Sequence, residues 1–364
     1  MTLRWITLAA MTLACALVSP AAHAASPDYC APTEGVDPLQ LLRQTSLDLR
    51  GRVPSYDEYE QVRDADDPQA AADALVDQML ESDEYLEQIR EYHQALLWGT
   101  LDSTILSTVF AAHRSLRPNG AGNWRLPNSR RVYRGDVIDC LNQEQTEFDA
   151  QGRPIPIETY ASPLCQGGTC RREGYVRVNP YWDPGSEIRV CAYDAQQAEL
   201  GVAGVACGSY HVNDRECGCG PDLQWCGPEN LGGPNEIIRE SLAQEPARIF
   251  EWVVSRRRSY LDAFVTDRTF MNGPVAHYYR NNTGTNTITQ GGAVAYEPAM
   301  GEIPDIPWSD VDTWMPVQRQ GPHAGAFTTL GYLIRFASNR SRANRFYTAF
   351  YCDPFVPSED GLPP

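Results

Sequence analysis

The chain has 364 residues, 42% of them apolar, which is enough for two modest domains or for one large domain with insertions. Its formal net charge of -17 argues against non-specific binding to nucleic acid or to anionic membranes, because both depend on a positive protein surface. All 30 basic residues are arginine, so Schiff-base lysines, phosphate-loop lysines and Ser-Lys dyads are excluded.

Residues 1–24 have the pattern of a secretory signal peptide. Arg4 precedes an apolar run from Trp5 to Val18, and Ala22-His23-Ala24 has the form of a cleavage site. A membrane anchor is disfavoured, because the run is shorter than the roughly 20 residues that span a bilayer. A lipoprotein modified at Cys15 is a further alternative to a free secreted form. We therefore expect export to the periplasm, the outer surface or the medium, with no integral membrane segment after signal cleavage.

Helical signals dominate residues 25–115, for which we predict a domain of four or five helices. Asp37 and Pro38 begin the first helix, and Gly51 is suited to the left-handed position that ends it. Ser55 and Glu58 have the spacing of a capping box, so a second helix follows a tight elbow.

Two further helices are predicted in the same domain. Asp67-Pro68 predicts the third helix and Ser82 the fourth, whose apolar stripe includes His93. Because His93 lies on that stripe, we interpret it as a core histidine with satisfied hydrogen bonds and not as a ligand.

Residues 116–234 are rich in Gly, Pro, Asn and Arg and predict an irregular insertion. Two short strands alternate in period two, at Tyr175 to Val178 and at Glu187 to Tyr193. Asp183-Pro184-Gly185 lies between them and predicts the turn of a β-hairpin. Loops of this length need covalent support in a compact domain.

Helical signals return over residues 235–356, and residues 357–364 have a linker-like composition. The final helices are predicted at Phe327 to Phe336 and at Ser341 to Tyr351, with the Pro-rich stretch before them as loop. The sequence as a whole predicts a mainly α fold, in which an N-terminal helical bundle and C-terminal helices pack together around a disulfide-rich insertion.

Ten cysteines follow the predicted signal peptide, and eight of them lie between Cys140 and Cys226. An even number in an exported chain indicates disulfides, and we expect at least three bridges in that region. Cys30 and Cys352 lie near the two ends and could pair with each other. The disulfide candidates are Cys30, Cys140, Cys165, Cys170, Cys191, Cys207, Cys217, Cys219, Cys226 and Cys352.

A zinc site is the alternative use of part of this set. His211, Cys217, Cys219 and Cys226 could supply four ligands of the kind that tetrahedral zinc prefers. The Cys-x-Cys spacing is not that of a usual zinc knuckle, so disulfides are the favoured interpretation and no metal is expected.

Three blocks together resemble a known family. LLRQTSLDLRGRVPSYDEY is similar to the RLSLDLxGxxPTxEE opening of secreted cytochrome-associated proteins of unknown function, which are abundant in planctomycete- and myxobacterial-type genomes. ALVDQMLESDEYLEQIREYHQALL resembles the helices that follow there, and GAFTTLGYLIRFASNRSRANRFYTAFYCDPFVP resembles that family's GxLTxxxfLxxxSnxxxxxxRxxxxxxxlCxPxxPP segment. The resemblance implies an envelope protein partner, and it implies that Asp48 and Arg50 hold the elbow between the first two helices.

The chain departs from that family in one respect that bears on cofactors. Family members carry a Cys-x-x-Cys-His haem attachment, whereas none of the six histidines here follows such a pair. We therefore expect no cofactor on this chain, with haem possible only on a separate segment or a partner.

The remaining candidate site residues lie near the C-terminus. His323 is positioned on a loop by Gly321, Pro322 and Gly325, so it could have a functional role. Arg335, Arg340 and Arg345 cluster around the last two helices, where they could grip an anion or pair with surface carboxylates.

No catalytic signature accompanies these residues: the chain has no Gly-x-Ser-x-Gly and no His-Glu-x-x-His motif. We therefore expect a binding or assembly module that works with an envelope cytochrome or a polymer-handling system. A carboxylate-dependent hydrolase of extracellular polymer is the alternative.

Overall fold

A computed structural model describes residues 36–101, 114–126, 139–201, 204, 207, 217–228, 234–282, 299–300, 303–320, 323–336 and 338–352. The chain divides into two compact units, Met1–Gln78 and Met79–Pro364, which are described separately. The predicted signal peptide, Cys30 and the C-terminal tail lie outside the described residues.

The first unit contains α1 (Pro38–Arg50), α2 (Tyr56–Arg63) and most of α3 (Pro68–Leu80). Gly51 ends α1 at φ 67°, and its N–H donates to the carbonyl of Leu47, as the sequence predicts. The capping box of α2 is also confirmed, because Ser55 and Glu58 each bond the other's backbone N–H. Asp37 makes no side-chain cap bond, although α1 begins directly after it.

A buried arginine holds the elbow between α1 and α2. The guanidinium of Arg50 donates to both carboxylate oxygens of Glu58, at 2.7 and 3.1 Å, and to the hydroxyl of Ser46 at 2.8 Å. This contact holds the pKa of Glu58 at about 2, far below its usual value. Asp48, by contrast, is exposed and accepts bonds from Gln44 one turn earlier on the same helix.

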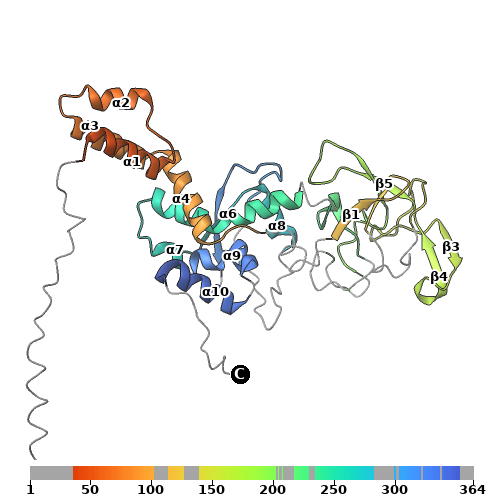
Figure 1. The fold of residues 1–364 in the computed structure, drawn as a ribbon. Coiled ribbons are helices and arrows are strands. Elements are labelled where there is room, and N and C mark those ends of the chain that lie inside the picture. Colours follow the sequence, from red (N-terminus) through yellow and green to blue (C-terminus); the bar gives the residue numbers. More distant parts are fainter. Residues whose placement is uncertain are drawn as a thin grey trace, which may run out of the picture. The chain divides into compact units, whose positions relative to one another are not determined.

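The second unit is built around the long helix α6 (Pro234–Ser255), which packs against α4 (Asp83–Leu96), α8 (Gly273–Asn282) and α9 (Leu330–Arg335) (Figure 1). The short helix α7 (Asp262–Val265) follows α6, and α10 (Asn339–Phe346) runs into a π-helical turn, Tyr347–Tyr351. Three-residue or four-residue 3-10 turns lie at Gln166–Gly168, Pro221–Leu223 and Gly325–Thr328.

α6 continues through Pro246. Pro246 has no N–H, so the carbonyl of Leu242 lacks its usual partner one turn later. α9 passes this point at Gly331, where an added Cβ would lie only 1.8 Å from the oxygen of Leu242. Glycine is therefore required for α9 to pack this closely on α6.

His93 is a core residue, as the sequence predicts. Its ring stacks on Phe250 with the centroids 4.2 Å apart, and only 3% of the residue is exposed. Nδ1 lies 2.6 Å from the carbonyl of Ile89, which can only accept, so Nδ1 carries the proton and Nε2 accepts from the hydroxyl of Tyr260. Burial lowers the pKa of His93, so the folded state favours the neutral ring.

The prediction of a mainly α fold is wrong, because the described residues also form three sheets. The largest is mixed, with the order β5-β6-β2-β1-β7; the second has the order β8-β10-β9; and β3 pairs with β4. The strands are β1 (Arg114–Pro118), β2 (Trp124–Arg125), β3 (Glu158–Ala161), β4 (Thr169–Arg172), β5 (Tyr175–Val178), β6 (Ile188–Cys191), β7 (Cys226–Pro228), β8 (Arg268–Met271), β9 (Ala299–Met300) and β10 (Met315–Gln320).

The predicted hairpin is present as β5 and β6, in which Tyr175 pairs with Cys191 and Val178 with Ile188. The missed strands are short and join distant segments: β1 pairs in parallel with β7, more than a hundred residues later. β8 and β10 pair across the stretch that the sequence predicts to be loop. Strands of two to six residues with remote partners leave almost no periodic signal in a sequence.

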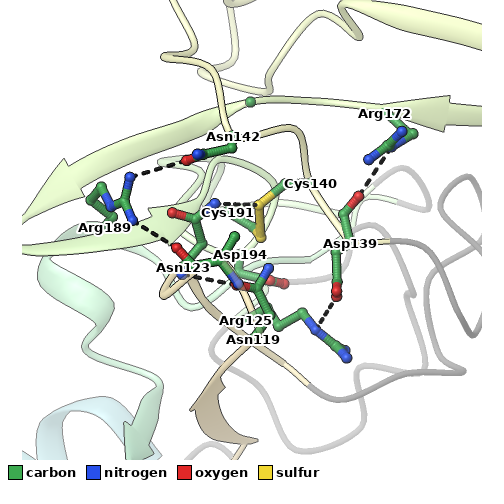
Figure 2. Close-up of a disulfide and its surroundings, with 12 residues drawn as sticks. Asn119, Asn123, Arg125, Asp139, Cys140, Asn142, Arg172, Arg189, Cys191 and Asp194 are labelled. Carbon is green, nitrogen blue, oxygen red and sulfur yellow. Dashed lines mark hydrogen bonds and ion pairs between the residues drawn. A yellow bond between two sulfur atoms is a disulfide. The ribbon is translucent and has the colours of Figure 1, made fainter.

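Four disulfides secure the insertion, which confirms the expectation of at least three. They are Cys140–Cys191, Cys165–Cys170, Cys207–Cys217 and Cys219–Cys226. Around the first of them, Asn123 donates to the sulfur of Cys140 and Arg189 donates to Asn142, so polar contacts surround the covalent bond (Figure 2). The protein is thus disulfide-stabilised.

Among the helices that the structure describes, none combines the length and the apolar character needed to cross a bilayer.

Candidate functional site

A polar cavity of about 460 Å³ lies where the end of α6, α7 and the start of β8 meet the loop that carries His323. Its lining residues are Trp252, Arg258, Asp262, Val265, Thr266, Asp267, Arg268 and His323. The cavity therefore gathers two arginines, two carboxylates, an imidazole and an indole, and its volume lies in the usual range of ligand sites, about 300–1,000 Å³.

Trp252 organises the two arginines of the cavity. The guanidinium carbon of Arg258 lies 5.1 Å from a ring centroid of Trp252, and that of Arg268 lies 5.5 Å from it. Both distances are within the range of cation–π attraction, so the indole restrains two cationic side chains that would otherwise be mobile.

The two arginines differ in their charge partners. Arg258, in the turn between α6 and α7, donates to a carboxylate oxygen of Asp262, four residues later, at 2.7 Å, so its charge is balanced locally. Within the described residues, Arg268 forms no ion pair with a carboxylate. Its guanidinium is therefore a candidate contact for an anion in the cavity, beside the carboxylate of Asp267.

Asp267 and Thr266 supply acceptors beside Arg268. One carboxylate oxygen of Asp267 accepts from the side-chain amide of Gln318 at 2.8 Å, which orients the carboxylate from the neighbouring strand β10. The hydroxyl of Thr266 accepts the backbone N–H of Arg268 at 3.2 Å, which fixes the first residue of β8. The backbone at Arg268 is thus held by Thr266, and the side chain of the preceding residue, Asp267, is held by Gln318.

A buried arginine on β10 holds the loop that brings His323 to the cavity. Arg319 is 2% exposed and donates to the carbonyl of Gly325 at 2.8 Å and to the hydroxyl of Thr328 at 2.9 Å. Gly325 adopts φ +50°, and an added Cβ there would meet the carbonyl oxygen of Ala263 at 1.8 Å. The loop packs too closely on α7 to shift easily.

The predicted arginine cluster does not converge on an anion site. Arg335 donates through Nε to the carbonyl of Trp98 at 3.1 Å, and Arg345 donates to the carbonyl of Leu96. Arg345 therefore bonds the carbonyl of the last residue of α4, and Arg335 bonds a carbonyl two residues beyond it, where positive charge also offsets the helix dipole. Arg340 is exposed and takes no part in these contacts.

The zinc alternative fails on its cysteines. Cys217, Cys219 and Cys226 are all bonded in disulfides, so they cannot act as thiolate ligands, and His211 lies outside the described residues. Across the described ranges, no group of three or more His, Cys, Asp or Glu side chains is arranged to hold a metal ion.

The sequence pointed to His323 but missed the residues that surround it. Trp252, Arg258 and Arg268 come from one stretch of seventeen residues, WVVSRRRSYLDAFVTDR, in which the sequence indicates helix but no site. The spacing of Arg258 and Asp262 is a local signal of an ion pair, but nothing local shows that β8 places Arg268 against Trp252.

Comparison of the chain with protein-family models, with curated proteins and with solved structures finds no match. The function is therefore inferred from the geometry of the cavity.

Proposed function

We propose that this protein is an exported binding module that works beside an envelope electron-transfer or polymer-handling system, and that the Trp252 cavity holds its ligand. Three observations support the proposal: the four disulfides suit an oxidising compartment, the sequence blocks resemble secreted cytochrome-associated proteins, and the cavity is lined by polar groups suited to recognition.

The ligand is one that presents a carboxylate or phosphate group. The observation that carries this assignment is Arg268, a guanidinium that is restrained by Trp252 and has no carboxylate partner among the described residues. An anion on Arg268 would lie beside Asp267 and Thr266, which accept hydrogen bonds from hydroxyl or amide groups on the same ligand. The two arginines of the cavity are formally offset by Asp262 and Asp267, so we expect a ligand with a single anionic group, bound by Arg268, to be favoured over a polyanion.

Isothermal titration with citrate and, separately, with inorganic phosphate tests this assignment and distinguishes the two anions. We expect saturable binding of at least one of them, weakened about tenfold by Arg268→Gln, because a charge-assisted hydrogen bond contributes roughly 1.5–3 kcal/mol. Arg340→Gln is the matched control, since Arg340 is an exposed arginine outside the cavity. Equal affinities for the two variants would overturn the assignment.

The hydrolase alternative needs a carboxyl group that stays protonated near neutral pH to act as the acid. Burial raises the pKa of Glu245, but that side chain is enclosed by Thr269, Tyr279 and Gly331 and does not line the cavity. Polysaccharide turnover that is abolished by Asp262→Asn or Asp267→Asn would nevertheless replace the binding proposal with an enzymatic one.

A further inference from the structure

Trp98 occupies a backbone position that normally belongs to glycine. The N–H of Trp98 bonds the carbonyl of Ala95 at 3.1 Å, and the N–H of Gly99 bonds that of Gln94 at 2.7 Å, which together form a Schellman motif after α4. Trp98 takes the left-handed conformation in this motif, at φ 51°, although a bulky side chain is disfavoured there. Its side chain is also unusually exposed, at 55%.

Two arginines fix the indole in place. The guanidinium carbon of Arg345 lies 4.2 Å from the centroid of the Trp98 ring, and Arg345 is itself buried. Arg335 bonds the carbonyl of Trp98 from α9. Arg345 therefore packs on the ring, and Arg335 restrains the backbone of Trp98, so the ring is a fixed platform despite its exposure.

This platform lines a second cavity, of about 470 Å³. The other lining residues are Glu91, Gln94, Ala95, Thr100 and Arg335, none of which lines the Trp252 cavity. An aromatic ring thus lies beside a carboxylate, an amide and a hydroxyl. The charges of Glu91 and Arg335 offset each other, so the cavity offers no unbalanced charge to an ionic ligand.

We propose that the Trp98 cavity binds the pyranose ring of a neutral saccharide. A pyranose presents C–H groups on its face, which pack on an aromatic ring, and hydroxyls around its edge, which need hydrogen-bond partners. Trp98 supplies the ring, and Glu91, Gln94 and Thr100 supply the partners at its edge. This site is separate from the proposed anion site and does not depend on it.

The test is isothermal titration of the intact protein with maltopentaose and with cellopentaose, which differ in linkage but present the same neutral ring. We expect saturable binding of at least one, weakened at least about tenfold by Trp98→Gly. Glycine suits the left-handed backbone position, so this variant removes the ring without straining the turn. Tyr56→Ala, which removes an aromatic ring that is 70% exposed elsewhere, is expected to leave binding unchanged.

Thr100→Val provides a second test that keeps the indole and its contacts. It replaces one hydroxyl with a methyl group, and we expect it to weaken saccharide binding about threefold. Absence of saturable binding for both pentasaccharides overturns the proposal, as does unchanged affinity in folded Trp98→Gly or in Thr100→Val. Citrate or phosphate binding, measured on the same variants, is expected to stay at the wild-type value, so failure of one site is distinguishable from failure of the other.

Discussion

Glu245, in the middle of α6, accepts the backbone N–H of Gly331, in the first turn of α9, at 3.1 Å through Oε2. Its other oxygen accepts from the hydroxyls of Thr269 at 2.6 Å and Tyr279 at 2.8 Å, and Tyr279 in turn accepts the N–H of Leu330. Thr329 directs its own hydroxyl to Ala326 and makes no cap bond. The buried carboxylate of Glu245 therefore caps the N-terminus of α9, directly at Gly331 and through Tyr279 at Leu330.

Substitution of this carboxylate is the first test of that relationship. In Glu245→Gln one oxygen becomes an NH₂ group, so in either orientation of the amide only one acceptor is left for the N–H of Gly331 and the hydroxyls of Thr269 and Tyr279. We expect the free energy of unfolding to fall by about 1–3 kcal/mol, the cost of an unsatisfied buried group. Urea denaturation measures it, with Glu240→Gln on the exposed side of the same helix as the control. Equal stability of the two variants would show that Glu245 does not support α9.

The close approach of α9 to α6 can be tested by adding one methyl group. In Gly331→Ala the new Cβ would lie 1.8 Å from the carbonyl oxygen of Leu242, so the helices must separate. We expect a loss of at least about 1–3 kcal/mol, as for overpacked cores. Gly120→Ala is the control, because nothing lies within 4 Å of an added Cβ there. A melting temperature for Gly331→Ala equal to that of the control would contradict the packing.

Local signals predicted the helices well, because capping depends on neighbours in the sequence. Gly51 and the pair of Ser55 and Glu58 end and begin helices where the residue types require it. The sheets could not be predicted in the same way, since β1 pairs with β7 more than a hundred residues later, and no local pattern indicates such a partner. Only part of the site could be predicted. Gly and Pro around His323 indicate a loop, whereas the contact between Trp252 and Arg268 is tertiary and leaves no local pattern.

His93 makes the stability of the protein sensitive to mild acid. Its pKa is lowered in the folded state, whereas the unfolded chain titrates near about 6.5. Its contribution is therefore complete above about pH 6.5 and is lost as the pH falls towards the folded pKa. Between pH 7.5 and pH 5.5 we expect the wild type to lose more unfolding free energy than His93→Gln. Parallel curves for the two proteins would show that His93 is not the titrating group.

The elbow of the first unit depends on the fork geometry of arginine. Lysine at position 50 cannot bond both oxygens of Glu58 and the hydroxyl of Ser46 together, so we expect Arg50→Lys to cost about 1–3 kcal/mol.

The pH dependence of stability is a second test of the contact between Arg50 and Glu58. Because the folded pKa of Glu58 is about 2 and the unfolded value about 4.5, this contribution is present above pH 4.5 and is lost as the pH falls towards 2. Acid titration followed by circular dichroism should show the gap between the wild type and Arg50→Lys closing over that range. A gap that persists at pH 2 would assign the loss to packing.

The titration of Arg268→Gln with citrate and phosphate tests the central claim most directly, because Arg268 is the arginine of the Trp252 cavity that forms no ion pair with a carboxylate among the described residues. The wild type and Arg340→Gln should bind at least one of these anions with equal affinity, more weakly as salt is added, and Arg268→Gln should bind about tenfold less tightly. Heat of dilution alone for the wild type, or identical isotherms for the three proteins, would contradict a role for this cavity in binding an anionic ligand.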